Sequence, residues 1–370
     1  MNVIRIYNER QEDWVTVPAT LPTLMPVQVI EQICAKLTDK PILPTPACTL
    51  IVGAGFSFGV VPLTRELLCH HIGNYYYEDS ENNKERRGED PVACRELSAE
   101  FWKELNAVVP REKRFRLSKG LPKDVSAAYQ ELFKFTGVNE LFAKMGADSG
   151  KQFMRGFLRY IMNPGDTGRN RLNPAHRKLA SLLQLQEDKD WPLRRFCRTI
   201  FTTNFDTLLH NSLDDVNVAY TVTDRPELGF GGFNFVQTEA SAIHLVYTHG
   251  RIMRHNPANT VAEIGDLSGK NASALSGYLT CRDVLVLGYG GWNDTLMSAL
   301  SACAAAKHHV YWFNRYPAAT AGNNLDPAVV KLINGSGGRA VYVPLGNQGA
   351  DGFMSDLYSA LSATAIRVSP

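Results

Sequence analysis

Short apolar runs recur along the chain, and each ends at a glycine or a polar residue. The first run, Leu50–Val52, stops at Gly53. A run that is apolar throughout is typical of a strand buried on both faces, as in parallel sheets. Later runs of the same character predict further strands at Cys197–Thr202, Ile243–Tyr247, Asp283–Leu287, His309–Phe313 and Arg339–Val343.

Segments with apolar residues at helical spacing lie between the expected strands. They predict helices at Ala175–Leu185, Thr207–Leu213, Asp294–Ala306, Pro327–Ile333 and Gly352–Ala363, the last with Asp351 as its N-cap. Shorter signals predict a helix after Pro62, a short strand within Val216–Val222 and a helix near Asn271–Tyr278. Strands that alternate with helices predict an α/β fold, here a Rossmann-like, doubly wound parallel sheet of about six strands.

The domain organisation follows from where this alternation begins and pauses. Residues 1–47 form an N-terminal extension with an expected helix at Val27–Leu37, and residues 48–370 form one catalytic domain. Helical patterns without a strand signal fill residues 66–172 around the charged loop Tyr75–Pro91. We therefore expect an inserted helical layer over one edge of the sheet.

Composition and charge exclude several classes of protein. The 370 residues are 44% hydrophobic and carry a formal net charge of +2, which fits a folded chain without a nucleic-acid surface. No apolar run approaches the roughly 20 residues of a membrane span, and the N-terminus has no apolar signal core. We expect a cytoplasmic protein that binds neither nucleic acid nor membranes directly.

The cysteines argue against a metal site. All seven are scattered, and none belongs to a C-x-x-C pair. We expect no zinc and interpret as buried free thiols those beside apolar segments, namely Cys48, Cys197, Cys281 and Cys303.

The candidate chemistry lies where the expected strands end. Open parallel sheets bind ligands outside the carboxyl ends of their strands, so these residues should share one rim. The first part of this rim along the chain is the turn Gly53-Ala54-Gly55, whose two glycines allow a sharp turn and close approach of a ligand. The alternative is a tight turn that binds no ligand. The rim residues are Gly53–Ser57, Asn204, Asp206, His249, Gly288–Trp292 and Asn314.

The order of these motifs resembles the sirtuin family, and more closely its divergent members in bacterial anti-phage defence. The resemblance extends from about residue 48 to about residue 345 and involves a glycine loop, a helix start, a T-x-N-x-D-like turn, an L-H-G-like motif, a ribose loop and a late asparagine. In this chain they are Gly53–Ser57, Asn173–His176, Thr203–Asp206, Thr248–Gly250, Gly288–Asp294 and Asn314.

Three departures from the protein deacylases of this family argue against an acyl-lysine substrate. The zinc-binding C-x-x-C pairs are absent, since residues 251–287 contain only Cys281. The segment that covers the nicotinamide ribose is replaced by Val60–Arg65, and the link from Asn204 to His249 is longer than usual.

The resemblance implies NAD as the substrate. It implies NAD contacts from Gly53, Ala54, Gly55, Phe56, Ser57, Thr203, Gly288, Tyr289, Gly290 and Asn314, and catalytic roles for Asn204, His249 and Asp206. An imidazole titrates near neutral pH, so His249 suits a general base, whereas the amide of Asn204 can orient ribose and water without titrating. Asp206 would accept from the nicotinamide amide, or it caps the helix that follows.

The expected function is therefore cleavage of the nicotinamide–ribose bond to nicotinamide and ADP-ribose, with depletion of NAD in anti-phage defence. The alternatives are an NAD-dependent deacylase or ADP-ribosyltransferase, or a non-catalytic module that senses NAD or ADP-ribose. Since an unregulated NAD hydrolase would deplete the NAD of its own cell, we expect a homo-oligomer and a regulatory partner. The resemblance suggests a HerA-type ATPase or an Argonaute-type sensor as that partner.

Overall fold

The computed structural model describes residues 3–8, 13–18, 21–38, 45–61, 172–188, 190–224, 242–250, 272–291, 294–303 and 308–368. The expected insertion at residues 66–172 and the helix after Pro62 lie outside the described residues. The expected boundary between an extension and a catalytic domain also stays a prediction.

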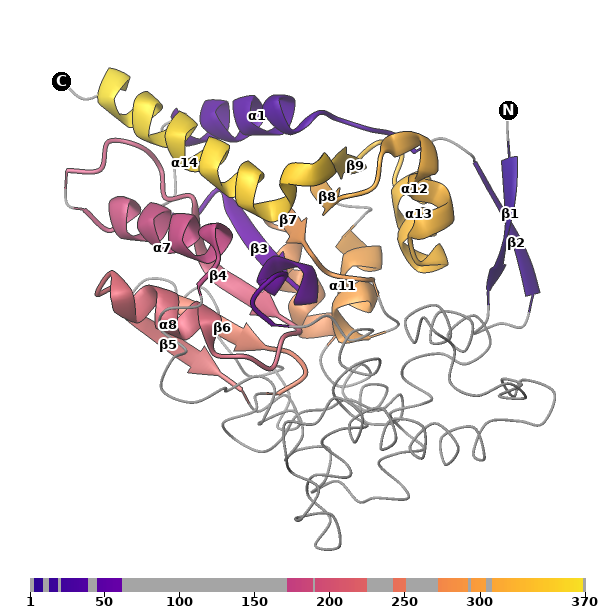
Figure 1. Ribbon diagram of the computed structural model, residues 1–370, viewed down its shortest axis with the longest axis horizontal. Helices are drawn as coiled ribbons and strands as arrows, with labels where there is room; N and C mark the ends of the chain where they lie inside the picture. Colours follow the sequence, from indigo (N-terminus) through magenta and orange to yellow (C-terminus); the bar gives the residue numbers. More distant parts are fainter. Residues whose placement is uncertain are drawn as a thin grey trace, which may run out of the picture. The chain divides into compact units, whose positions relative to one another are not determined.

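A seven-stranded, entirely parallel sheet forms the centre of the fold (Figure 1). Its strand order, β5-β6-β4-β3-β7-β8-β9, confirms the Rossmann-like architecture, and β5 is the short strand expected within Val216–Val222 in addition to the six others. The strands are β3 (Cys48–Val52), β4 (Cys197–Thr202), β5 (Tyr220–Thr223), β6 (Ile243–Tyr247), β7 (Asp283–Leu287), β8 (Val310–Asn314) and β9 (Ala340–Pro344).

Helices cover both faces of the sheet, and a separate hydrophobic cluster fills each interface. Neighbouring side chains of β3 alternate between them, with Leu50 and Val52 in the first cluster and Ile51 in the second. The first contains α1 (Pro26–Thr38), α7 (Pro174–Gln186), α8 (Leu208–Asp215) and α14 (Gly349–Val368). The second contains residues 272–279, α11 (Thr295–Cys303), α12 (Ala318–Asn324) and α13 (Pro327–Gly335).

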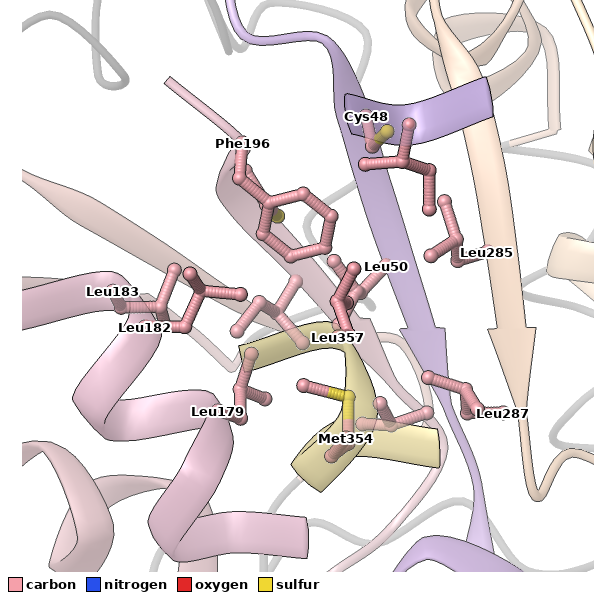
Figure 2. Packing of buried hydrophobic residues seen from close by; sticks show 14 of the residues in the cluster. Cys48, Leu50, Leu179, Leu182, Leu183, Phe196, Leu285, Leu287, Met354 and Leu357 are labelled. Carbon is pink, nitrogen blue, oxygen red and sulfur yellow. The ribbon is translucent and has the colours of Figure 1, made fainter. Parts of the chain in front are cut away.

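The first cluster places α7 and α14 against the middle of the sheet. Figure 2 shows leucines of α7 and the α14 residues Met354 and Leu357 directed at Leu50 of β3 and its neighbours. Helix α1 adds Val29, Ile33 and Leu37, all at most 1% exposed. The expected helix of the N-terminal segment is thus confirmed, and it packs on the main fold as part of the core.

Some details differ from the expectations. Helix α14 begins at Gly349, so Asp351 lies inside its first turn rather than at the N-cap, and its Oδ1 accepts the N–H of Ala175 at 2.8 Å. Cys281 is exposed, because it lies in the turn between the helix at residues 272–279 and β7. The antiparallel pair β1 (Val3–Asn8) and β2 (Asp13–Pro18) and helix α12 were not expected.

The carboxyl ends of β3 and β7 meet through backbone atoms. The Gly53 N–H donates to Leu287 O at 3.0 Å, and the Gly55 N–H donates to Gly288 O at 2.9 Å. A Cβ atom on Gly53 would lie 2.6 Å from Gly288 O, and one on Gly288, whose φ is +68°, would lie 2.3 Å from Phe56 N. Glycine is therefore required on both sides of this contact, whether or not a ligand approaches the turn.

We expect Gly288→Ala to lower the free energy of unfolding by at least about 2 kcal/mol, because it combines a positive φ with a backbone clash. Gly277→Ala is the matched control: a Cβ there meets nothing within 4 Å in an exposed helical position, so it should stabilise by about 0.5–1 kcal/mol. Urea denaturation of both variants measures the difference. Equal and small effects would contradict the role assigned to the backbone contact.

Candidate functional site

Asn204 follows β4 and is held in one orientation. Its side-chain Nδ2 donates to Gly53 O at 3.2 Å and to Ser57 Oγ at 3.1 Å, while its backbone N–H donates to Thr202 Oγ1 at 3.0 Å. A carbonyl oxygen can only accept, so the amide nitrogen must be the atom that faces Gly53. The amide oxygen takes part in none of these contacts and is the atom that Asn204 can offer to a ligand.

Ser57 connects Asn204 to a buried carboxylate. Its hydroxyl donates to Asp206 Oδ2 at 3.1 Å, and Asp206 Oδ1 accepts the N–H of Leu208 at 3.0 Å. Burial raises the pKa of Asp206, although the Leu208 N–H and the Ser57 hydroxyl oppose the shift. The Leu208 bond satisfies a free amide in the first turn of α8, which is the helix-capping alternative; contact with a substrate amide stays a prediction.

His249 follows β6, the strand beside β4. The Thr248 N–H donates to Thr202 O at 3.0 Å, which ties the two strand ends together. The imidazole is buried at 4% exposure, and its Nε2 lies 3.0 Å from Oδ2 of Asp294, which immediately precedes α11. Asp294 was expected at the start of a helix and in the loop that resembles the sirtuin ribose loop, and this contact with His249 was not expected.

The other predicted NAD contacts differ in accessibility. Ala54 and Gly290 are exposed, whereas the side chain of Tyr289 is buried against Trp312. The ring of Phe56 is fully buried and packs edge-on to His176, so any ligand contact there would involve its backbone. Half-buried positions are Gly55, Thr203, Gly288 and Asn314, the last at the end of β8.

Asn173 supports the glycine turn from α7 and was not expected to do so. Its Oδ1 accepts the N–H of His176 at 3.0 Å as an N-cap, and its Nδ2 donates to Phe56 O at 2.7 Å. The sequence signal for the cap was Pro174 at the first helical position. The same Oδ1 lies 2.6 Å from His176 Nδ1, so the buried ring is a neutral donor, and burial lowers its pKa to about 3.

Within the described ranges, no group of three or more His, Cys, Asp or Glu side chains is placed to hold a metal ion. Five of the cysteines are free thiols there, and Cys69 and Cys94 lie outside these ranges. No helix of the described part combines the length and the apolar character that crossing a bilayer requires.

Residues 198–329 match the family model of the SIR2-like domain. The matched stretch extends from β4 into α13 and contains Asn204, Asp206, His249 and Asp294, but not the glycine turn on β3. The match and the parallel sheet support the resemblance to sirtuins that the motifs indicated. No curated protein matches the chain.

We expect the fold to weaken in mild acid. The pKa of His176 is lowered to about 3 and that of His244 to about 4, both by burial, so the unfolded chain binds protons that the folded chain does not. Stability should therefore fall as the pH drops below about 6.5, by roughly 1–2 kcal/mol per histidine at pH 5. Urea denaturation between pH 7 and pH 5 tests this.

The variant His176→Asn should be less stable at pH 7, but its stability should fall less steeply toward pH 5 than that of the parent. The difference in slope should approach about 1.4 kcal/mol per pH unit, the contribution of one proton. Parallel slopes for the two proteins would show that His176 does not titrate in this way.

Proposed function

We propose that this protein hydrolyses NAD at the nicotinamide–ribose bond, so that NAD and water give nicotinamide, ADP-ribose and a proton. The observation that carries the proposal is that Asn204 and His249 occupy the same edge of the sheet. Both are buried polar residues at the carboxyl ends of the adjacent strands β4 and β6, and both lie inside the SIR2-like match. This is the edge at which open parallel sheets bind nucleotides.

The protein need not donate a proton to the leaving group, since nicotinamide leaves as a neutral molecule. Positive charge develops at ribose C1′, and fixed polar groups around the ribose can stabilise it. The free oxygen of Asn204 would orient the attacking water or a ribose hydroxyl. His249 would take the proton that this nucleophile releases. Ser57 and Asp206 keep the Asn204 amide from rotating, so its oxygen needs no rearrangement when substrate binds.

We expect His249→Ala and Asn204→Ala each to lower the rate of nicotinamide release by roughly 10²–10⁴-fold, the usual contribution of a general base or an orienting group. Matched controls are His308→Ala, near the amino end of β8, and Asn324→Ala, exposed on α12. Both should stay within about threefold of the parent, because they lie away from the proposed site. If all four variants behaved alike, the site would be wrong.

The same assay separates the rival reactions. Acylated peptide added with NAD would be consumed only by a deacylase, and transfer to protein would mark an ADP-ribosyltransferase. Binding of NAD without turnover in any assembly state would favour a sensing module. A chelator should leave nicotinamide release unchanged, because the proposal involves no zinc; loss of activity would overturn that part.

The cellular context is also part of the proposal. We place the reaction in the cytoplasm, as a depletion of NAD that defends a bacterial cell against phage. Such an NAD hydrolase must be kept inactive until infection, because it would otherwise deplete the NAD of the uninfected cell. Self-assembly and a separate protein, a HerA-type ATPase or an Argonaute-type sensor, would supply it.

We expect a homo-oligomer at micromolar concentration, measured by light scattering coupled to size exclusion. Deleting residues 1–40 would be a poor test, because α1 contributes Val29, Ile33 and Leu37 to the core. Val27→Glu is better, since Val27 is 58% exposed on α1 and its replacement should reduce the oligomer mass if this surface makes contacts. A fully active monomer would contradict self-assembly, and full activity without a second protein would contradict the partner.

A further inference from the structure

We propose that Asp294 is a positioning residue for His249, one that fixes its tautomer and stabilises the imidazolium formed when His249 takes up a proton. The inference rests on the proposed function, because it gives His249 the role of base. It assigns a function to a carboxylate that the sequence indicated only as the start of a helix and the last residue of the expected ribose loop.

The first support is the isolation of the two facing atoms. Asp294 is 0% exposed and His249 4%. Nε2 of His249 and Oδ2 of Asp294 lie 3.0 Å apart, and neither has a hydrogen-bond partner among the described residues. The contact is therefore a close electrostatic one rather than a formed hydrogen bond. Catalytic hydrogen bonds that are poorly aligned in the free enzyme often form only when substrate binds, and the 3.0 Å separation is short enough for one here.

The second support is the fixed orientation of the carboxylate. Asp294 Oδ1 accepts the N–H of Met297 at 2.9 Å and the hydroxyl of Tyr289 at 2.5 Å. The first turn of α11 and the loop after β7 therefore hold one oxygen, and the other is directed at His249. By contrast, Asp326, which caps α13 through the Ala328 N–H at 2.9 Å, is only partly buried. Capping alone does not require the deep burial of Asp294.

The arrangement determines which ring nitrogen can act as the base. An ionised carboxylate only accepts, so the proton of the neutral ring belongs on Nε2, and the lone pair on Nδ1 is left for the substrate. When the nucleophile is activated, its O–H bond breaks and an Nδ1–H bond forms. The positive charge of the ring then lies beside Asp294, which stays ionised and stabilises it.

The kinetic test is Asp294→Asn, which removes the charge and retains a good helix cap. We expect kcat for nicotinamide release to fall by about 10²–10⁴-fold with KM within about threefold, because the loss concerns proton transfer. The matched cap variant Asp326→Asn should change neither. Tyr289→Phe, which removes one hydrogen bond to the carboxylate, should lower kcat by a smaller factor. If Asp294→Asn kept kcat within about threefold of the parent, the inference would be wrong.

A second readout needs no substrate and separates this inference from the proposed function. Long-range ¹H–¹⁵N spectra of histidine-labelled protein report the tautomer of each of the nine histidines, with His249→Gln to assign the signal. We expect the Nε2–H form in the parent and a changed tautomer in Asp294→Asn. Unchanged spectra would overturn the inference even if NAD is cleaved. A changed tautomer in a protein that does not cleave NAD would support the pair and refute the proposed reaction.

Discussion

Backbone hydrogen bonds join the turns that follow β3 and β7, at the point in the sheet where the connections change direction. Gly53 and Gly55 approach Gly288 so closely that no side chain fits between them. This contact positions the turn that carries Gly53 O and Ser57, the two groups that hold the Asn204 amide. Any shift of the end of β3 relative to the end of β7 would therefore change the orientation of the Asn204 amide.

Two carboxylates organise the site in parallel ways. Asp206 caps the first turn of α8 and holds Ser57, while Asp294 caps α11 and faces His249. Asp206 links the start of α8 to the turn that follows β3, and Asp294 links the start of α11 to His249 after β6. The free energy of helix capping and the geometry of the site are consequently coupled, because one oxygen of each carboxylate caps the helix while the other faces the site.

The sequence predicted the parallel strands well, since Leu245–Tyr247 of β6 and Val284–Leu287 of β7 are uninterrupted apolar runs within the observed strands. It failed for α12, whose residues Ala318–Asn324 contain glycine and asparagine and no apolar stripe. The β1–β2 pair could have been found, because Val3–Asn8 and Asp13–Pro18 carry alternating apolar residues.

The site was predictable as a rim but not as a set of contacts. The parallel topology of the backbone alone places Asn204 and His249 at one edge of the sheet, independently of their side-chain contacts. The pairing of His249 with Asp294 joins residues far apart in the chain, and no local pattern encodes it. The same reason explains the error at Asp351, whose carboxylate satisfies the amide of Ala175 on α7. Such long-range pairings depend on packing, which periodicity does not describe.

The position of β3 determines how this domain can be divided. The stretch that matches the SIR2-like domain contains β4, β5 and β6, which precede β3 in the strand order of the sheet, and β7 and β8, which follow it. It does not contain β3 itself, the strand between β4 and β7. A fragment cut at residues 198 and 329 would hold two half-sheets with no shared hydrogen bonds. Both would present a bare, apolar edge to solvent, a configuration prone to aggregation. Residues 45–61, which lie far upstream in the chain, are thus required to join the two halves of the sheet. Without them, the stretch that matches the SIR2-like domain is not a folding unit.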